Sequence, residues 1–585
     1  MVNAISIIAI GLGTAFLLGL IRERRESLAH ALTVLALAAM SVVAVGWLWL
    51  LGPGGAPVQE ITTAGTTPPF AINLRVGLSE AVALVMITLA GLASALHMRA
   101  ALLRMGRRAM AVLLIAVMAL AGIVMTRDLF NLFVFFELAA ISTGGMVLLS
   151  DDDDALGAGF KYMIVAQFVS ILLLIGIIFS YHATGSLNID DMGGLAAMGG
   201  GAALAAFLVV AALVLETKPF PANGWALDIY QAAHPGFSAI LSAGTGTAAL
   251  IAVDKFAGAS GAVLAPVLTG IGLLTFVAAN LLGLSQTNDR RLLGYSSVAQ
   301  TGLILAVIGQ REALGESYLL IAGGLLVGHA IAKAGLFWLS GLVKGRDLTD
   351  WASLRGNPLL VFAMATFLAM LLGLPPFPGF YAKWALVHGL VASGGGALVA
   401  LVLIGALIEA GYLLRWFGFT MKREVSEGVA TTSAELALVV TVALVGWGAG
   451  WIWGEVGPYE NLLRAPALLL ALAFLLLDGL PARVKNVAAI ATLIGGFAAS
   501  YASYDPLQLI FAAIIMPGGA VILLASFYEH GRRVGFYPSA MLMFAGMAML
   551  IVAETSFGFF AAWEVLTIGS YFLILRGKYS EPHAL

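Results

Sequence analysis

Apolar segments long enough to cross a lipid bilayer recur along the whole chain. A helix needs about 20 apolar residues to span about 30 Å of hydrocarbon. Hydrophobic residues make up 61% of the sequence and charged residues only 11%, so no stretch has the composition of a separate soluble domain. We therefore predict an all-α, polytopic integral membrane protein.

The apolar segments fall into two groups, which predict two domains at residues 1–460 and 461–585. The first group holds about fourteen transmembrane helices, and the second holds about five more. The predicted spans of the first group are 3–20, 29–51, 77–97, 109–125, 129–149, 159–181, 201–217, 236–254, 262–284, 292–309, 316–343, 358–389, 396–420 and 434–454; those of the second are 465–478, 485–501, 506–527, 537–553 and 557–576.

Basic residues are distributed unevenly between the predicted loops. Clusters such as RMGRR (104–108) and the pair Arg532 and Arg533 fall in alternate connections. Cytoplasmic loops carry the excess of Lys and Arg, so we expect the N-terminus outside and the C-terminus inside. The opposite loops hold only isolated basic residues: Arg75, Arg127, Lys255, Arg311 and Arg464.

Two proline clusters interrupt apolar segments at corresponding places. KPFP (218–221) and PPFP (375–378) are separated by five spans. Because this number is odd, the second repeat lies in the membrane in the opposite orientation to the first. Gly/Pro-interrupted segments in two inverted halves indicate a transport site near the midplane. We therefore predict two inverted five-helix repeats, at about 109–258 and 262–420, each with one broken helix.

A second internal similarity involves the C-terminal extension. The segment at 126–149 is echoed by the segment at 554–575, which aligns Glu137 with Glu564. The extension therefore resembles the start of a second unit, whose glutamate has no lysine partner in this sequence. We expect a separate polypeptide to complete that unit, or these helices to form a docking surface; chance similarity between apolar helices is the alternative.

Several ionisable side chains lie inside the predicted spans. A charged residue at a helix centre costs about 2.5–3.5 kcal/mol on insertion scales, and such residues usually face a bundle interior or an aqueous cavity. Several of them together imply a network of mutually compensating groups. The candidates are Glu137, Lys218, His329, Lys333, Lys383 and Glu409.

Structural roles are the competing interpretation for each of these residues. Lys218 could extend from a helix end to the membrane interface, and a buried histidine is often only a packing residue. Glu409 could pair locally with Arg415. Glu216 and Asp228 are expected to serve only the helix break and the loop that follows it.

The chain offers few means of enzymatic chemistry. It has no cysteine, which excludes disulfides, thiolate zinc sites and cysteine-held iron–sulfur clusters. It also has no nucleotide-binding loop or zinc motif. We expect neither a cofactor nor a metal in this chain, and any redox chemistry would belong to a partner.

Five motifs follow one another along the chain: DLFNLFVFFEL (128–138), ETKPFPANGWALDIYQAAHP (216–235), RRLLGYSSVAQTG (290–302), GHAIAKAGLF (328–337) and LPPFPGFYAKW (374–384). Taken together they resemble the antiporter-like subunits of respiratory complex I, Mrp-type sodium/proton antiporters and membrane-bound hydrogenases. The resemblance covers roughly residues 70–420. It implies that Glu137 and Lys218 gate proton entry, that Lys333 is the central lysine with His329 beside it, and that Lys383 leads to the exit.

The eighth predicted helix departs from the family pattern. Many relatives have a lysine or histidine there, whereas this chain offers only Ser242, Thr245 and Thr247. Either water bridges this gap or the channel is impaired. Ser242 and Thr247, with Glu409 and Glu564, are therefore possible additional members of the relay.

The resemblance implies a proton-translocating membrane subunit of a multisubunit complex in a prokaryotic cytoplasmic membrane. Its partners would be other membrane subunits of a complex I-like, hydrogenase-like or Mrp-like assembly, driven by a redox or ion-transport module. Mrp-type sodium/proton exchange is one alternative. A scaffold, or an inorganic-carbon-uptake partner with an impaired channel, is another.

Overall fold

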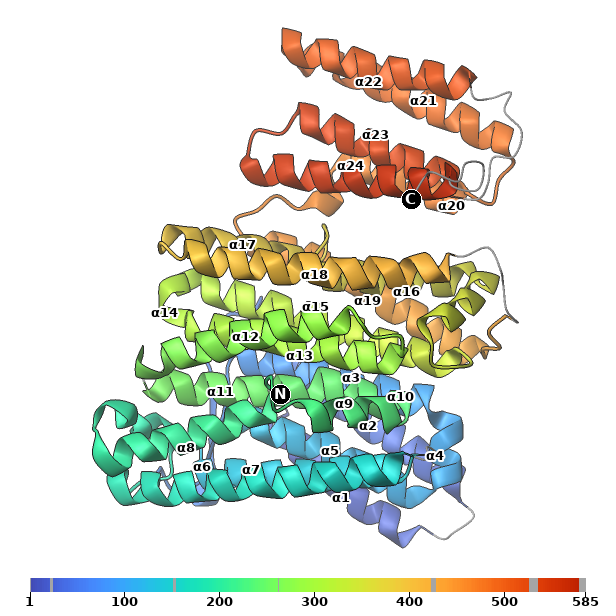
Figure 1. The fold of residues 1–585 in the computed structure, drawn as a ribbon. Coiled ribbons are helices and arrows are strands. Elements are labelled where there is room, and N and C mark those ends of the chain that lie inside the picture. Colours follow the sequence, from blue (N-terminus) through green and yellow to red (C-terminus); the bar gives the residue numbers. More distant parts are fainter. Residues whose placement is uncertain are drawn as a thin grey trace. The chain divides into compact units, whose positions relative to one another are not determined.

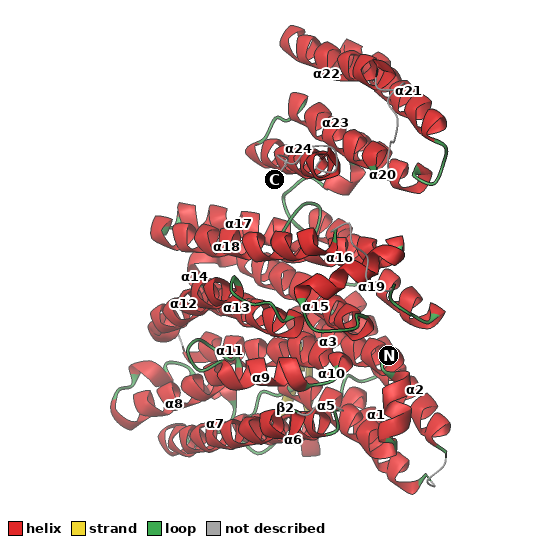
Figure 2. Cartoon of the chain, turned by 45° about the vertical axis from the view of Figure 1, so that its right-hand side comes forward, coloured by secondary structure: helices red, strands yellow, loops and turns green. Residues whose placement is uncertain are grey.

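The computed structural model describes residues 2–21, 25–150, 154–260, 262–421, 428–525 and 535–577, and these are almost entirely helical (Figures 1 and 2). By their internal contacts they form two compact units. The first unit comprises Met1–Leu372 and Ala385–Gly446, and the second comprises Gly373–Trp384 and Trp447–Leu585.

The helices of the first unit lie side by side with short connections (Figure 1). They are α1 (Ser6–Leu20), α2 (Glu26–Leu51), α3 (Leu78–His97), α4 (Arg99–Met105), α5 (Arg107–Met125), α6 (Leu129–Leu148), α7 (Ala155–Thr184), α8 (Gly200–Glu216), α9 (Gly224–Ala232), α10 (Pro235–Ile240), α11 (Gly246–Ser260), α12 (Ala265–Gly283), α13 (Asp289–Gly309), α14 (Arg311–Leu314), α15 (Tyr318–Leu342), α16 (Pro358–Leu372) and α18 (Gly396–Thr420).

The second unit contains α20 (Pro466–Leu477), α21 (Ala482–Ser500), α22 (Pro506–Ala525), α23 (Phe536–Ile551) and α24 (Ser556–Gly577). Two helices, α17 (Pro378–Ala392) and α19 (Ser433–Val456), are divided between the units. Short 3₁₀ turns lie at η1 (Thr63–Gly65), η2 (Ile189–Met192), η3 (Leu195–Ala197), η5 (Ala262–Leu264), η6 (Gly315–Ser317), η7 (Leu348–Gly356), η8 (Leu462–Arg464) and η9 (Tyr501–Ser503).

The prediction of an all-α polytopic membrane protein is confirmed. Among the described residues, 14 helices are long and apolar enough to cross a membrane, and shorter apolar helices account for most of the remaining predicted spans. One element was not predicted, a small antiparallel hairpin in which β1 (Gln59–Thr62) pairs with β2 (Asn73–Val76). Its strands lie between apolar segments and are too short to leave a clear pattern in sequence.

Both predicted helix breaks are present. The chain leaves helical geometry between α8 and α9, at KPFP, and between α16 and α17, at PPFP. Proline removes a backbone donor and clashes with the preceding turn. The freed carbonyl groups of these breaks must therefore be satisfied by protein or water, since lipid offers no donors.

The helices of the two predicted repeats make contacts in the same cyclic order. In the first repeat, α5 contacts α6, α6 contacts α7, α7 contacts α8, α8 contacts α11 and α11 returns to α5. In the second, α12, α13, α15, α16 and α18 contact one another in the same cyclic sequence. Each repeat is thus a closed ring of helices.

The helices α11 and α13 lie in the interior of the first unit. Of the 18-residue apolar stretch that qualifies each helix as a membrane span, 94% of the residues are buried in Pro235–Ala259 and in α13. The corresponding share is 39% in α7 and 28% in α18. A polar side chain on α11 or α13 therefore faces protein on nearly every side.

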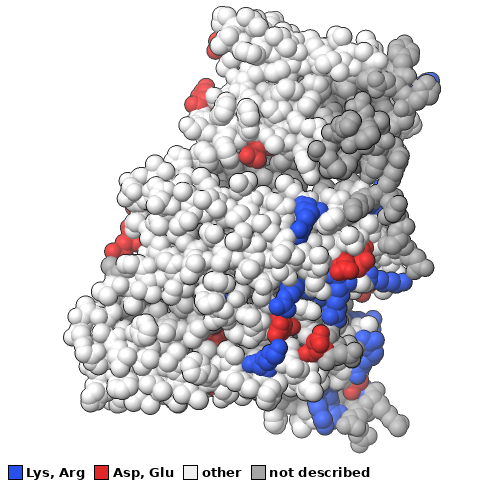
Figure 3. Space-filling model, viewed as in Figure 1, with Lys and Arg blue, Asp and Glu red and all other residues white. Residues whose placement is uncertain are grey.

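Charged residues are sparse on the surface of the first unit. Figure 3 shows Lys and Arg gathered at one end of its helices, with few charges elsewhere on the visible face. Lys161 of α7 and Arg291 of α13 pair with Asp228 of α9 at N–O distances of 2.9 and 3.2 Å. Asp228 therefore links α9 to two neighbouring helices, and its predicted role at the helix break and the following loop stays a prediction.

Candidate functional site

Lys218 lies in the break between α8 and α9. It is 8% exposed, and among the described residues it is the one non-glycine with a positive φ, 62°. A side chain in this backbone region costs of order 1–3 kcal/mol, and such strain clusters at functional sites. The burial also contradicts the alternative in which Lys218 extends to the membrane interface.

A small enclosed cavity adjoins Lys218. Its volume is about 10 Å³, which is near the minimum for one water molecule. The Lys218 ammonium lies 6.0 Å from the ring centre of Trp225, whose ring packs on Tyr162. The polar lining residues are Thr143, Tyr162, Glu216, Lys218, Tyr230 and Thr245.

The carboxylate that interacts with Lys218 is Glu216 at the end of α8. Glu137, the expected partner, accepts a hydrogen bond of 3.1 Å from Gln167 and interacts electrostatically with Glu216. The acidic side of the site is thus a pair of carboxylates. Glu216 interacts with Lys218, and Glu137 interacts with Glu216. Spacing along one helix could not reveal this, because Glu137 and Glu216 lie on different helices.

Hydroxyl groups cluster at the eighth predicted helix. The Ser242 and Ser297 hydroxyls are 2.8 Å apart, and the Tyr230 hydroxyl faces both. Ser242 lies in the π-helical turn η4 (Leu241–Thr245), a widened turn often found at functional sites. Thr247 instead donates to the carbonyl of Ala243 in its own helix, at 2.5 Å.

His329 and Lys333 lie one turn apart on α15, deep in the first unit. Lys333 is fully buried and donates to the carbonyl of Leu293 at 3.3 Å. Both ring nitrogens of His329 lack a hydrogen-bond partner among the described residues. The imidazole interacts electrostatically with Lys333 and Lys218, and it faces the Ser242 backbone without a hydrogen bond.

Glu409 of α18 is the acidic group that interacts with Lys333. It is fully buried, accepts hydrogen bonds of 2.9 Å at both oxygens from Gln300, and accepts one of 3.4 Å from Ser296. Arg415 donates to the carbonyls of residues 284 and 286. The hypothesis that Glu409 pairs locally with Arg415 is therefore wrong.

Lys383 and Glu564 both belong to the second unit. The Lys383 side chain passes close to Gly373, at which a Cβ would lie 2.8 Å from the lysine Cδ. Gly373 has a φ of 71°, so glycine is required there for both conformation and space. The other predicted site residues belong to the first unit, namely Glu137, Lys218, Ser242, Thr247, His329, Lys333 and Glu409.

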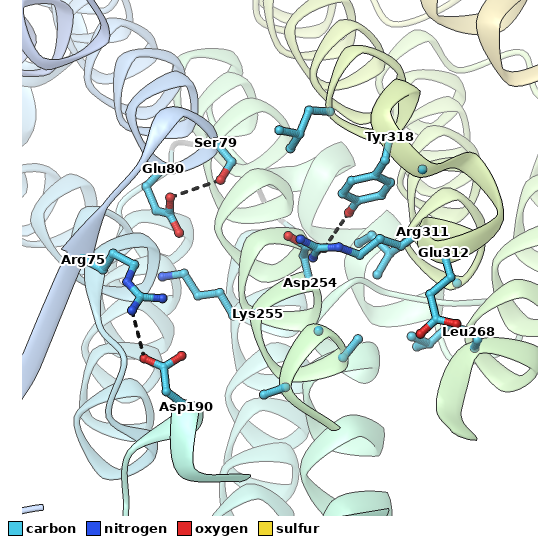
Figure 4. Close-up of a pocket in the computed structure, with 18 of the residues that line it drawn as sticks. Arg75, Ser79, Glu80, Asp190, Asp254, Lys255, Leu268, Arg311, Glu312 and Tyr318 are labelled. Atoms are coloured by element: carbon cyan, nitrogen blue, oxygen red, sulfur yellow. Dashed lines mark hydrogen bonds and ion pairs between the residues drawn. The ribbon is translucent and has the colours of Figure 1, made fainter. Parts of the chain in front are cut away.

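A second, larger cavity of about 710 Å³ lies at the ends of the helices of the first unit (Figure 4). It collects four of the five isolated basic residues noted in the sequence, namely Arg75, Arg127, Lys255 and Arg311. Figure 4 shows Lys255 between Arg75 and Glu80, with Asp254, Arg311 and Tyr318 on the other wall. The cavity is a polar basin between loops and helix ends.

Most charges of this basin are paired. Asp190 pairs with both Arg75 and Arg127, and Asp254 accepts from Arg311 at 2.7 Å and from the Tyr318 hydroxyl at 2.5 Å. Burial works against the charge of Arg75, but its hydrogen bond to Glu60 and the charge of Asp190 raise the pKa of Arg75 above its usual value.

Lys255 stabilises the end of α5. Its ammonium donates to the carbonyls of Val124 and Thr126, which no longer have partners within that helix. We expect Lys255→Met to lower the free energy of unfolding by about 1–3 kcal/mol, because buried carbonyls lose their donor. Thermal unfolding in detergent measures this, and the exposed Lys161→Met should leave the midpoint unchanged; an equal effect of both variants would contradict the assignment.

Within the described ranges, no group of three or more His, Asp and Glu side chains is arranged to hold a metal ion. Sequence reasoning missed Tyr162, Tyr230, Ser296, Ser297 and Gln300 as members of the site. The signal for three of them was the polar stretch SSVAQ inside the apolar span 292–309.

The fold and the site define a polytopic membrane protein with two broken helices and a buried row of ionisable groups, an arrangement typical of ion-conducting membrane proteins. The chain belongs to the family described as "NADH:quinone oxidoreductase/Mrp antiporter, TM", whose profile matches residues 126–409. It is 30% identical over 367 residues to the NADH-quinone oxidoreductase subunit N of Rubrobacter xylanophilus, covering 57% of this chain and 75% of that protein.

Solved structures show the same fold. A chain of the membrane-bound sulfane sulfur reductase, an archaeal respiratory membrane complex, matches with a TM-score of 0.69 and 26% identity over 77% of this chain and 96% of that chain. A chain of the Mrp complex from a Dietzia species matches with a TM-score of 0.71 and 22% identity, covering 77% of this chain and 94% of that chain.

Proposed function

We propose that this chain conducts protons across the membrane through the buried groups of its first unit. The observation that supports this proposal is that two buried lysines, each influenced by an acid, a buried histidine and a cluster of hydroxyl groups all lie within one unit. A proton would move from Glu137 and Glu216 to Lys218, and along Tyr230, Ser242 and Ser297 to His329 and Lys333. The exit by way of Lys383 stays what the resemblance implies.

The driving step is a change in the pairing of Lys218 with an acid. Burial disfavours a charged lysine, and a nearby carboxylate favours it. Movement of the acidic pair toward or away from Lys218 would therefore switch that lysine between holding and releasing a proton. Glu409 plays the corresponding part for Lys333 at the other end of the hydroxyl chain.

Other membrane subunits would supply the driving force. The relatives are named as subunits of NADH-quinone oxidoreductase, and the structural neighbours belong to a membrane-bound reductase and an Mrp complex. By analogy this chain works in a multisubunit assembly, and redox or ion-transport chemistry in its partners opens the Lys218 pair. The distribution of basic loops favours an N-terminus outside and a C-terminus inside.

The hydroxyl chain provides the test of this path. We expect the double variant Tyr230→Phe with Ser297→Ala to slow proton movement about tenfold, equivalent to about 1.4 kcal/mol in the barrier, because it removes two of three hydroxyls. The measurement is acidification of vesicles containing the assembled complex. A matched control, Tyr318→Phe with Ser180→Ala, removes the same groups elsewhere; an unchanged rate in the first variant would refute the path.

Sodium/proton exchange is the second candidate, favoured by the similarity in fold to a chain of the Mrp complex. The same vesicles distinguish the two. A requirement for sodium on one side assigns exchange, and proton movement at full rate without sodium assigns conduction. A complex that assembles and shows neither activity would indicate the scaffold role.

A further inference from the structure

The helices α20 to α24 take no part in the proposed path, yet they carry an acidic group inside an apolar span. Glu564 lies in the middle of α24 and is neither fully buried nor fully exposed. Among the described side chains of the second unit, none donates a hydrogen bond to the Glu564 carboxylate or forms an ion pair with it. A carboxylate in a membrane span normally faces protein or water, because lipid cannot solvate it.

The packing of α20 to α24 reproduces the packing of the first helices of the chain. In the first set, α1 contacts α2 and α5, α2 contacts α3 and α5, and α5 contacts α3 and α6. In the second set, α20 contacts α21 and α23, α21 contacts α22 and α23, and α23 contacts α22 and α24. Every helix contact within one set has its counterpart in the other, with α24 in the place of α6.

The helices α6 and α24 share a capping hydrogen bond at the same place and the same spacing from that cap to a glutamate. The Asp128 side chain accepts a hydrogen bond of 2.7 Å from the backbone N–H of Asn131 at the start of α6. The Thr555 side chain accepts one of 2.9 Å from the backbone N–H of Gly558 at the start of α24. Glu137 lies nine residues after the first cap and Glu564 nine residues after the second.

In the first unit, α7 covers one side of α6. Gln167 of α7 donates to Glu137. A Cβ at Gly144 of α6 would lie 2.4 Å from the sulfur of Met163, and a Cβ at Gly159 of α7 would lie 3.6 Å from Val147. The side of α6 that faces α7 is therefore marked by Glu137, Gly144 and Val147.

The corresponding side of α24 is not covered by described residues of the second unit. At the same spacing it carries Glu564, Tyr571 and Ile574, and Ile574 is 56% exposed. On the opposite side, a Cβ at Gly546 of α23 would lie 2.4 Å from the backbone nitrogen of Leu566. Among the described residues, contacts within the unit thus hold α24 on one side, while on the glutamate-bearing side Ile574 is exposed and Glu564 and Tyr571 are partly exposed.

We propose that the side of α24 formed by Glu564, Tyr571 and Ile574 binds a transmembrane helix of another membrane subunit, in the way that α6 binds α7. That helix presents a donor, an amide or a basic side chain, to Glu564. It carries a small residue opposite Tyr571, because the tyrosine stands where α6 has a glycine. The inference rests on helix packing and family membership, and does not require that the first unit conducts protons.

Photo-crosslinking in the native membrane tests the proposal directly. A photoreactive amino acid at Ile574 should capture one polypeptide, at a transmembrane segment with a glycine, alanine or serine near the cross-link. The same group at Val487, an exposed apolar position on α21, should yield only lipid adducts. Lipid adducts alone at Ile574, or a cross-link to another segment of this chain, would overturn the proposal.

Loss of the Glu564 charge provides a second measurement. Glu564→Gln should lower the yield of the Ile574 cross-link about fivefold, as expected when a charged hydrogen bond is lost. Glu554→Gln, at an exposed position just before α24, is the matched control and should leave the yield unchanged. Equal yields for both variants would show that Glu564 has no part in the contact. Vesicle acidification by the first unit is scored separately, so failure of either proposal is distinguishable.

Discussion

Replacing Lys218 by alanine is expected to abolish coupled proton movement. Lys218 is the cation beside Glu216 and the small cavity, and no other lysine or histidine lines that cavity. Loss of a positioned proton carrier typically costs a factor on the order of 10² or more. The rate of vesicle acidification by the assembled complex measures the effect.

The control for this variant is Lys161→Ala. Lys161 lies on α7 and is 64% exposed, and its surface ion pair with Asp228 should contribute little, about 0–1 kcal/mol. Both variants should co-purify with the same subunits in the same amounts. Full proton movement by a correctly assembled Lys218→Ala complex would remove the proposed path.

Replacing Glu409 by glutamine is expected to have the second largest effect. The variant keeps the size of the side chain but removes the charge that interacts with the buried Lys333. A buried lysine without its acid no longer holds a proton readily, so proton movement should fall by a factor on the order of 10². Glu409→Asp retains the charge and should recover part of the rate.

Arg415→Ala separates the two interpretations of Glu409. If Arg415 were the partner of Glu409, its loss should reproduce the effect of Glu409→Gln. The structure shows Arg415 bonded only to backbone carbonyls within the described residues, so proton movement should be nearly unchanged. Equal losses of proton movement in Arg415→Ala and Glu409→Gln would support the local ion pair and contradict the proposed role of Glu409 at Lys333.

The sequence by itself determined the class of fold and the positions of its helices. Crossing a bilayer requires long apolar helices because lipid cannot hydrogen-bond a bare backbone, and clustered prolines inside an apolar segment interrupt its helix. These local rules located the spans, both breaks and the ionisable residues within the spans. They missed the β1–β2 hairpin, because its four-residue strands are too short to show a pattern.

Tertiary structure alone decided which of these residues meet. Glu137 interacts with Glu216, Ser242 lies beside Ser297, and Glu409 interacts with Lys333, and each pair joins residues on different helices that the sequence gives no reason to connect. The physical reason is that electrostatic and hydrogen-bond partners are set by distance in space, which depends on how helices pack. Periodicity along one helix reveals which side chains share its face, but not which helix that face will meet.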